Sequence, residues 1–340
     1  MRALVTGGAG FIGCNMADRL ASKGYEVVVF DNFSRKGTEL NAEWFKERHT
    51  NIEIVKGDLS KDFKKLDEII KACDEVYHFG AQTSVPVSIA NPRADFEANI
   101  LGTLNVLEAV RKSSRECPLF YSSTNKVYGE LSGVKIIEKQ DRYDFADLKN
   151  GINEAMPLDF QTPYGCSKGS ADQYVKEYAK LYGLKNIIFR QSCIYGPRQL
   201  GLEAQGWVAW FVIAALLEKP IKIYGDGKQV RDLLYIDDLV DAIELAMQKK
   251  CFGEIFNIGG GKERAASLLD VIDIIEKKTG KKIEMSFHDW RAGDQKVYYT
   301  DYSKAERLLG WKPKIGIEEG IERLIEWARE NLCFLSKVYG

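Results

Sequence analysis

The sequence predicts an α/β fold in which a doubly wound parallel sheet is followed by a smaller α+β region. Apolar strand segments alternate with amphipathic helices through the first two-thirds of the chain, and a glycine-rich turn joins the first strand to the first helix. The alternation loosens after Gly196. We therefore expect two regions, residues 1–195 with the sheet and residues 196–340 after it, with some interleaving.

The first strand, turn and helix predict a dinucleotide site of the Rossmann type. Arg2–Thr6 is a short apolar strand, and a helix is expected over Asn15–Lys23. Glycines in the turn between them let backbone N–H groups approach a pyrophosphate at the helix N-terminus. The residues expected at this pyrophosphate are Gly7, Gly10, Phe11, Ile12 and Gly13.

The end of the second strand, Glu26–Phe30, distinguishes between two dinucleotides. Asp31 follows at the spacing of a carboxylate that accepts from ribose hydroxyls. Because this carboxylate would repel a 2′-phosphate, we expect NAD rather than NADP, although Arg35 and Lys36 weaken the preference. Asn32, Ser34 and Arg35 are assigned to the same site.

Further cofactor contacts are expected where later strands end, since ligands of doubly wound sheets bind beyond the carboxyl ends of strands. Strands are predicted at Ile52–Val55, Val76–Phe79, Leu119–Ser122 and Asn186–Arg190, and helices at Phe96–Ser113 and Ser167–Leu181. The residues assigned to the cofactor here are Asp58, Leu59, Gly80, Ala81, Gln82, Asn99 and Ser122. For Asp58, ordinary turn chemistry is an open alternative.

Thr124, Tyr164 and Lys168 carry the predicted catalytic chemistry. Tyr164 and Lys168 are spaced to share one face of a helix. A phenol with an ordinary pKa of about 10 is a poor base at neutral pH, and a fixed positive charge beside it lowers that pKa. The Thr124 hydroxyl would hold a substrate oxygen. We predict that this trio removes a proton from an alcohol beside the dinucleotide, which Tyr164 and Lys168 also contact.

Candidate substrate residues lie next to Thr124 and in the later region. Asn125 and Lys126 follow Thr124 directly, while Gln199, Arg231 and Arg291 lie in turns or irregular segments. Guanidinium groups suit a diphosphate because they donate two parallel hydrogen bonds. The alternative for each arginine is a solvated surface charge. The long polar segment 130–162 is predicted to cover the substrate side.

Composition excludes several classes of protein. A chain of 340 residues with 45% hydrophobic and 29% charged residues is typical of a globular protein, and a formal charge of −1 predicts no nucleic-acid or membrane partner. Seven cysteines without a CxxC pair indicate reduced thiols and a cytoplasmic location. Three isolated histidines predict no metal site.

Several motifs together resemble the extended short-chain dehydrogenase/reductases of the sugar-nucleotide epimerase group, over nearly the whole chain. They are Gly7-x-x-Gly10-x-x-Gly13, Asp31-Asn32, Asp58-Leu59, Ser123-Thr124 with Val127-Tyr128-Gly129, Tyr164-x-x-x-Lys168, Val230-Arg231-Asp232, Asn257-Ile258-Gly259 and Arg291-x-Gly293-Asp294. Within the group, the segments Asp31–Gly37, Ser122–Gly129, Pro163–Gly169 and Gln205–Phe211 most resemble the branch that converts CDP-paratose to CDP-tyvelose.

The resemblance implies bound NAD, transient oxidation of a ring hydroxyl and return of the hydride to the other face of a keto-sugar. Tyr164 is then the base, Lys168 lowers its pKa and holds the nicotinamide ribose, and Thr124 binds the reacting oxygen. Arg231 and Arg291 would grip the diphosphate of a nucleotide sugar, with a CDP-sugar favoured. Related 4,6-dehydratases carry an Asp-Glu pair where this chain has Asn125 and Lys126. Because elimination needs that carboxylic acid as a proton donor, the chain should not be a dehydratase.

Two alternatives stay open. A UDP-hexose 4-epimerase would use the same trio with the sugar rotated. A non-catalytic dinucleotide sensor would use the fold to bind a protein partner, although such proteins commonly lose the Tyr-Lys pair, which is intact here. The resemblance also makes a homo-oligomer the expectation.

Overall fold

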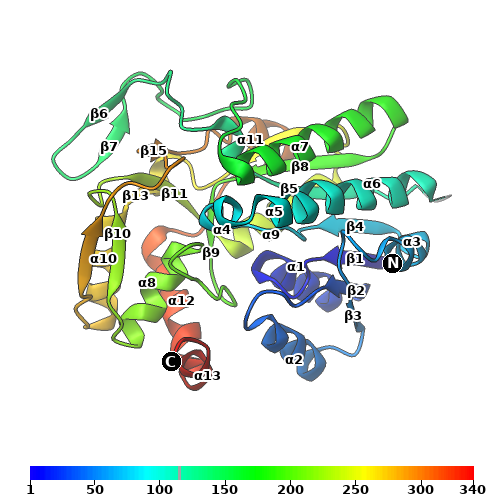
Figure 1. The fold of residues 1–340 in the computed structure, drawn as a ribbon, viewed down its shortest axis with the longest axis horizontal. Helices are drawn as coiled ribbons and strands as arrows, with labels where there is room; N and C mark the ends of the chain where they lie inside the picture. The colour runs from blue at the N-terminus through cyan, green and yellow to red at the C-terminus, as the bar shows by residue number, and fades with distance from the viewer. Residues whose placement is uncertain (114–115) are drawn as a thin grey trace. The chain divides into compact units, whose positions relative to one another are not determined.

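The computed structural model describes residues 1–113 and 116–340 of the chain (Figure 1). It divides into two compact units that interleave in sequence. Unit 1 contains Met1–Thr124, Pro163–Arg190 and Val240–Phe256; unit 2 contains Asn125–Thr162, Gln191–Leu239 and Asn257–Gly340. A single cut at 195/196 therefore describes the chain incompletely, because Asn125–Thr162 belongs with the later region and Val240–Phe256 with the earlier one.

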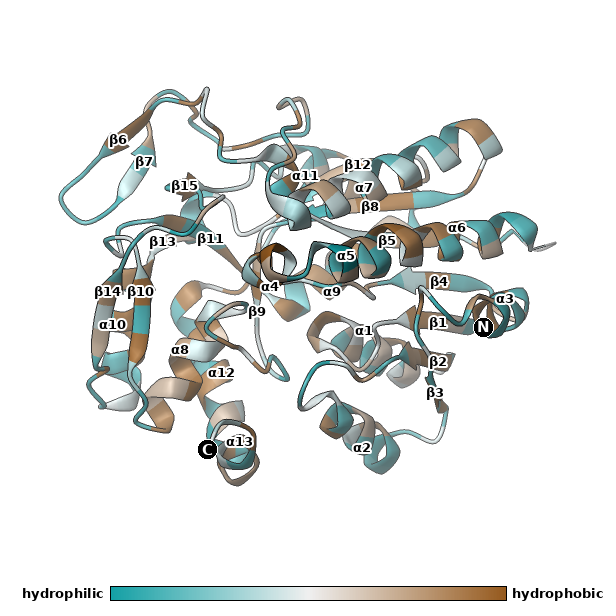
Figure 2. Ribbon diagram, in the orientation of Figure 1, coloured by the Kyte–Doolittle hydropathy of each residue, from teal (hydrophilic) through white to brown (hydrophobic). Residues whose placement is uncertain are grey.

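Unit 1 is built on a seven-stranded sheet, which confirms the predicted doubly wound fold. The strand order is β12-β8-β5-β4-β1-β2-β3, and β1 pairs in parallel with both β2 and β4. The strands are β1 (Arg2–Thr6), β2 (Glu26–Asp31), β3 (Ile52–Lys56), β4 (Glu75–His78), β5 (Leu119–Thr124), β8 (Asn186–Gln191) and β12 (Ile255–Ile258). In Figure 2 the apolar stretches of β1 and β2 are brown, whereas β4 is mostly teal to white.

Helices cover both faces of this sheet. They are α1 (Phe11–Ser22), α2 (Thr38–Arg48), α3 (Phe63–Lys71), α4 (Val85–Ala90), α5 (Pro92–Phe96), α6 (Gly102–Lys112), α7 (Thr162–Tyr182) and α9 (Ile236–Gln248). Leu66 of α3, Val106 of α6 and Val175 of α7 share one apolar core with the sheet. Arg19 of α1 pairs with Asp241 and Glu244 of α9, so these two helices lie side by side.

The helix predicted over Phe96–Ser113 is broken in the structure. A π-helical turn, η1 (Glu97–Leu101), separates α5 from α6. π-Helical turns are rare and often occur at functional sites. This turn carries Asn99, one of the predicted cofactor residues, which is buried.

Unit 2 combines short strands with helices. It contains η2 (Asn125–Tyr128), β6 (Ile136–Glu138), β7 (Tyr143–Phe145), β9 (Cys193–Tyr195), α8 (Trp207–Leu216), β10 (Ile221–Tyr224), β11 (Val230–Tyr235), η3 (Lys262–Arg264), β13 (Ala265–Ser267), α10 (Leu268–Thr279), β14 (Met285–His288), β15 (Val297–Tyr298), α11 (Ser303–Leu309), α12 (Ile317–Glu330) and α13 (Leu332–Tyr339). β11 pairs with β9, β13 and β15.

The polar segment 130–162 is anchored in unit 2 by its few apolar residues. Tyr143, Phe145 and Ile152 are buried in one cluster with Val230 and Tyr298. β6 and β7 form an antiparallel pair at the tip of the segment. This segment is therefore part of the unit 2 core, and its expected role as a substrate cover stays a prediction.

Candidate active site

The glycine turn after β1 forms a cradle that only glycines fit. Gly7 has a φ of +63°, and a Cβ there would lie 2.7 Å from the Gly80 Cα. A Cβ on Gly13 would lie 2.3 Å from the Gly7 carbonyl oxygen. The turns after β1 and β4 therefore abut, and α1 starts directly against the first of them. Gly10 is the N-cap of α1, and it has no side chain to accept a hydrogen bond from the first N–H groups of the helix. A helix N-terminus without such a side-chain cap fits an anionic pyrophosphate.

The acidic residues predicted for the ribose and adenine contacts are tied to this turn. Asp31 accepts hydrogen bonds from the backbone N–H groups of Ala9 (3.0 Å) and Phe33 (2.9 Å). Burial raises the pKa of the Asp31 carboxyl. Asn32 donates to Asp58 (3.1 Å), whose other oxygen accepts from Ser60. The two predicted groups thus meet, and Asp58 also performs ordinary turn chemistry.

Two further predicted cofactor residues, Gln82 and Asn99, bind each other beside the catalytic helix. The Gln82 N–H donates to Asn99 Oδ1 (2.8 Å), and Asn99 Nδ2 donates to the Ser167 hydroxyl of α7 (2.9 Å). Leu59 packs toward Gly80, because a Cβ on that glycine would lie 2.5 Å from the Leu59 Cδ1. The predicted cofactor residues of the first, third and fourth strand ends and of η1 therefore gather in unit 1.

The catalytic trio also lies wholly in unit 1. Thr124 ends β5, and its hydroxyl hydrogen-bonds the Tyr164 phenol. Tyr164 lies in the first turn of α7, where its N–H donates to the Ser88 hydroxyl (3.1 Å). Lys168 Nζ donates to the Ser122 carbonyl (2.7 Å) and lies 4.4 Å from the centre of the Tyr121 ring. All three side chains are buried.

The expected lowering of the Tyr164 pKa does not occur in this structure. Burial raises the pKa of Tyr164 to about 12, while the Thr124 hydrogen bond acts in the opposite direction. Burial also lowers the pKa of Lys168 to about 7, against the charges of Asp172 and Asp95. Desolvation of both charged forms outweighs the effect that spacing alone predicts.

A buried ion pair supports Lys168, and the sequence analysis missed it. Asp172 accepts two hydrogen bonds from Arg190, of 2.8 and 3.0 Å, and a third from Ser123 (2.7 Å). Asp172 lies one helical turn after Lys168, so the same spacing argument that joined Tyr164 to Lys168 would have found it.

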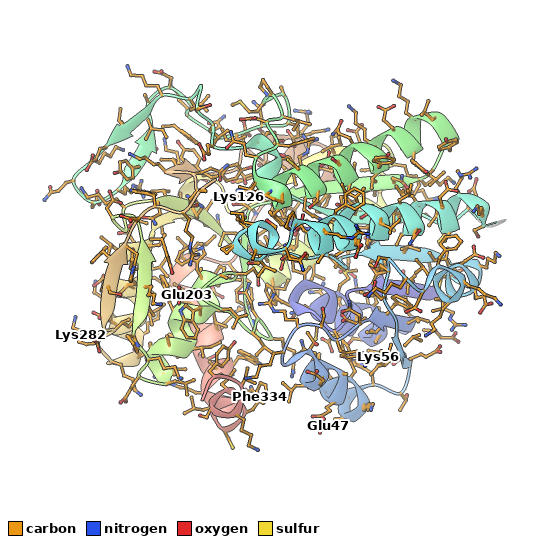
Figure 3. The ribbon with its side chains drawn as sticks, viewed as in Figure 1. Glu47, Lys56, Lys126, Glu203, Lys282 and Phe334 are labelled. Atoms are coloured by element: carbon orange, nitrogen blue, oxygen red, sulfur yellow. The ribbon has the colours of Figure 1, made fainter. Side chains whose placement is uncertain are left out.

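The predicted substrate residues other than Thr124 all lie in unit 2, and two of them share one carboxylate. Arg231 donates to Asp294 (2.6 Å), and the Lys126 ammonium is 3.7 Å from the same oxygen. Lys126 is labelled in Figure 3. Lys126 also donates to the Gly293 carbonyl (3.0 Å), and burial lowers its pKa to about 8. Asn125 donates to Gln295 at 3.5 Å.

Arg291 and Gln199 occupy different surroundings. The Arg291 guanidinium lies 3.6 Å from the centre of the Tyr224 ring, and it donates to the Glu203 carbonyl (3.1 Å). Arg291 is therefore a stacked cation that stays partly exposed to solvent. Gln199 is buried and donates to the Ile194 carbonyl (3.1 Å). Asp294 lies in the Arg-x-Gly-Asp motif, which was recognised in the sequence without a role for the acid.

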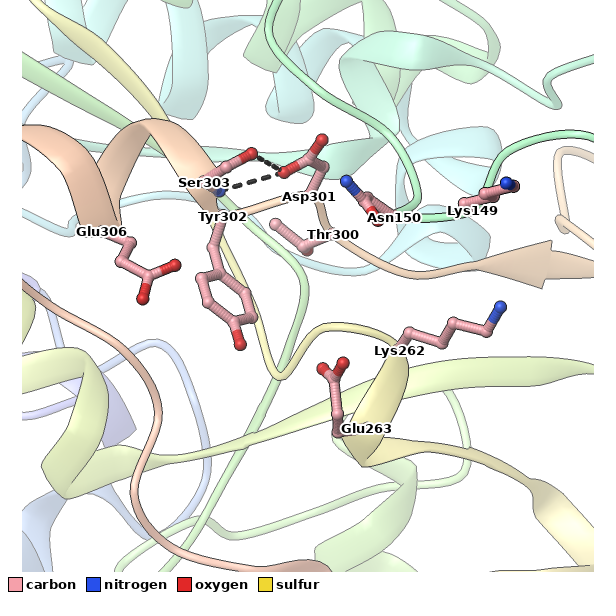
Figure 4. Close-up of a pocket in the computed structure, with 9 residues that line it drawn as sticks. All are labelled: Lys149, Asn150, Lys262, Glu263, Thr300, Asp301, Tyr302, Ser303 and Glu306. Carbon is pink, nitrogen blue, oxygen red and sulfur yellow. Dashed lines mark hydrogen bonds between the residues drawn. The ribbon is translucent and has the colours of Figure 1, made fainter.

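One pocket of unit 2 contains none of the predicted residues. It is lined by Lys149, Asn150, Lys262, Glu263, Thr300, Asp301, Tyr302, Ser303 and Glu306 (Figure 4). Its charged lining residues are two lysines and three carboxylates. Mixed charge of this kind does not indicate a particular ligand.

Comparison with known proteins identifies the family. Residues 4–324 match the family described as GDP-mannose 4,6 dehydratase. The chain belongs to this family. Membership confirms the resemblance to the extended short-chain dehydrogenase/reductases that act on nucleotide sugars. Within the described residues, no helix has both the length and the apolar character needed to cross a membrane.

Individual relatives cover the chain almost completely. It is 41% identical to the CDP-paratose 2-epimerase of Salmonella typhi, over 96% of this chain and 99% of that protein. The UDP-glucose 4-epimerase of Thermotoga maritima, solved with UDP-glucose, is 34% identical, with a TM-score of 0.83 over 98% of this chain and 100% of that one. The UDP-glucuronic acid 4-epimerase of Bacillus cereus, solved with UDP-glucuronic acid and NAD, is 29% identical, with a TM-score of 0.84 over 97% and 99%.

Proposed function

We propose that this protein is an NAD-dependent epimerase of a nucleotide-diphosphate sugar, and that it inverts C2 of the sugar in CDP-paratose to give CDP-tyvelose. The observation that carries the chemistry is the buried Thr124–Tyr164 hydrogen bond with Lys168 on the same helix. The 41% identity to a CDP-paratose 2-epimerase over 96% of the chain supports the choice of sugar.

Unit 1 supplies the groups for the oxidation and reduction of the sugar. Thr124 holds the reacting hydroxyl. Tyr164, as its phenolate, accepts the hydroxyl proton as the ring carbon becomes a ketone, and the neutral phenol then returns the proton to the same oxygen. Bound NAD supplies the hydride acceptor and donor. The cradle of Gly7, Gly13 and Gly80, closed to any side chain, fits its pyrophosphate, and Asp31 fits a ribose without a 2′-phosphate.

Unit 2 supplies cations suited to the diphosphate. Lys126, Arg231 and Arg291 all act electrostatically on the single carboxylate of Asp294 and lower its pKa. Glu203 lies 3.7 Å from Arg291, and the charge of Glu130 acts on Lys126, so a diphosphate would replace carboxylates as the partner of these cations. Inversion requires the keto-sugar to turn over, so a firm hold on the diphosphate must accompany a loose hold on the sugar.

Epimerisation is favoured over elimination by the residues after Thr124. A 4,6-dehydratase needs a carboxylic acid to protonate the departing hydroxyl. Asn125 and Lys126 occupy the two positions after Thr124, and Asn125 is bonded to Gln295. Neither residue carries a carboxylic acid, and the Lys126 ammonium is already hydrogen-bonded to the Gly293 carbonyl.

Incubation with separate nucleotide sugars tests the proposal. We expect CDP-paratose to be converted to its C2 epimer, scored by proton NMR, and UDP-glucose to stay unchanged. Conversion of UDP-glucose to its C4 epimer instead would establish the second candidate, which the similarity to the Thermotoga maritima enzyme supports.

Tyr164→Phe is the control. This variant should lose turnover and retain bound NAD. If it keeps most of its activity, Tyr164 is not part of the mechanism. If none of the sugars reduces the bound NAD, the alternative of a non-catalytic dinucleotide sensor is favoured.

A further inference from the structure

One buried carboxylate of unit 1, Asp95, takes part in none of the steps above. It lies in α5, immediately before the π-helical turn, with 1% of its surface exposed. Its Oδ1 accepts from Gln82 Nε2 (2.7 Å) and from Asn99 Nδ2 (3.2 Å). Its Oδ2 is buried and has no hydrogen-bond partner among the described residues. A carboxylate with one unpaired oxygen is costly to bury unless its charge acts on a nearby group.

The hydrogen bonds of Asp95 lead to the catalytic helix. Asn99 Nδ2 reaches Asp95 and also donates to Ser167, which lies between Tyr164 and Lys168 in sequence. Ser84 fixes the Gln82 carboxamide, because the Ser84 N–H donates to the Gln82 side-chain oxygen Oε1 (2.5 Å). The π-helical turn gives Asn99 this inward position. Asp95 thus holds two carboxamides in one orientation against α7.

Asp95 also acts electrostatically on both members of the Tyr164–Lys168 pair. Its charge raises the pKa of each of them. The other groups facing the pair are Asp172 with its partner Arg190, the Thr124 hydroxyl, Tyr121 and His78. Burial lowers the pKa of His78 to about 3 and raises that of Tyr121 well above 10, so both are neutral at physiological pH. Asp172 has the larger effect on Lys168 and is paired with Arg190, whereas Asp95 forms no ion pair among the described residues.

We propose that Asp95 is a positioning residue for the Tyr164–Lys168 pair: it orients the Gln82 and Asn99 carboxamides against α7 and supplies a buried negative charge beside the Lys168 ammonium. The inference rests on the proposed function, because it assigns a role within the same catalytic site. The charge keeps Lys168 cationic in surroundings that favour its neutral form. It also sets the pH at which the phenol gives up its proton.

Asp95→Asn separates the charge from the hydrogen bonds, because an amide oxygen still accepts from Gln82 and Asn99. Without the negative charge, both Tyr164 and Lys168 lose their protons more readily. We expect their titration midpoints, followed by NMR of carbon-13-labelled tyrosine and lysine in the full-length protein, to fall by roughly half to one pH unit. Tyr164→Phe and Lys168→Met identify the two resonances. Unchanged midpoints in D95N would overturn the inference.

The matched control is Glu97→Gln, which removes a carboxylate from the neighbouring π-helical turn. Glu97 is partly exposed and pairs with Arg93 at the surface, so both midpoints should stay in place. Asp95→Glu, which keeps the charge, should also keep them. If D95N is insoluble, Asp95→Ala carries the same measurement. These titrations need no sugar, so the two failures can be told apart. A shift without turnover on any nucleotide sugar would contradict the proposed function, while the effect of Asp95 on the titration of Tyr164 and Lys168 would still be established.

With the correct sugar, the rate profile gives a second readout. Both limbs of the plot of log(kcat/KM) against pH should move to lower pH in D95N by the same amount as the midpoints. A uniform loss of rate without a shift would show a merely structural role and contradict the proposal.

Discussion

At the scale of single residues, burial decides the chemistry that spacing only permits. The sequence places a phenol and an ammonium one helical turn apart, and this arrangement is confirmed in α7. The sequence does not reveal that both side chains are buried or that Lys168 donates to the Ser122 carbonyl. Nor does it reveal that Asp95 and Asp172 raise the pKa of Lys168. Desolvation opposes the charged form of each group, so the pair depends on acidic neighbours that lie elsewhere in the chain.

The lowered pKa of Lys168 makes stability depend on pH. The folded-state pKa is about 7, against 10.5 for the ordinary group, so between these values the unfolded chain binds more protons than the folded one. The contribution of Lys168 to the free energy of unfolding therefore increases as the pH rises from about 7 to 10.5. This contribution is lost as the pH falls through 7. In Lys168→Met this contribution disappears.

Urea unfolding of the wild type and K168M at a series of pH values checks this expectation. K168M should exceed the wild type in stability near pH 7, and the gap should narrow toward pH 10.5. A gap that stays constant over this range would mean that Lys168 titrates normally in the folded protein.

At the scale of helices and strands, local pattern predicted the strands of the unit 1 sheet and several of its helices, and it failed where tertiary partners replace local pattern. The strand β11 was not predicted, because Arg231 and Asp232 interrupt its apolar residues. Both are buried: Arg231 pairs with Asp294, and Asp232 accepts from the N–H groups of Gly261 and Thr300. The partners come from segments distant in sequence, and a local window does not contain them. The π-helical turn around Asn99 was missed for the same reason.

The start of α1 gives a prediction about an element. Gly13→Ala would place a methyl group 2.3 Å from the Gly7 carbonyl oxygen, so the helix must move away from the turn. We expect loss of bound NAD and a loss of stability of about 1–3 kcal/mol, measured by cofactor release and thermal unfolding.

Gly133→Ala is the matched control, since a Cβ there meets no atom within 4 Å. It should retain NAD and change the free energy of unfolding by no more than about 0.5 kcal/mol. Full NAD content in G13A would show that the turn accommodates a side chain, contrary to its geometry.

At the scale of the whole molecule, the predicted cofactor and catalytic residues fall in unit 1 and the other predicted substrate residues in unit 2. The chain passes from unit 1 to unit 2 directly after Thr124. The residue proposed to hold the reacting oxygen is therefore followed at once by Asn125 and by Lys126, one of the cations around Asp294. This division predicts that cofactor binding and nucleotide binding can be lost separately.

Arg231→Met tests the separation. It removes the cation nearest to Asp294, and we expect affinity for CDP, measured by calorimetry, to fall on the order of ten- to a hundred-fold. NAD content should not change. Arg231→Lys keeps the charge without the planar fork and should lose less affinity.

Lys277→Met, which removes an exposed cation of α10, is the control and should leave both NAD content and CDP affinity unchanged. Equal CDP affinity in R231M and the wild type would remove Arg231 from the diphosphate site.

The sequence by itself determined the fold class, the glycine turn, the acid that follows the second strand and the Tyr-Lys pair, because each depends on the pattern of residues within single elements and on the order of those elements. Only the tertiary structure decided the division into interleaved units, the burial that moves the pKa values of Tyr164 and Lys168, and the partnerships of Asp95, Asp172 and Asp294. Those features depend on which distant segments of the chain fold over a charged group and exclude water from it. The free energy of that desolvation cannot be read from the residues next to the charge in sequence.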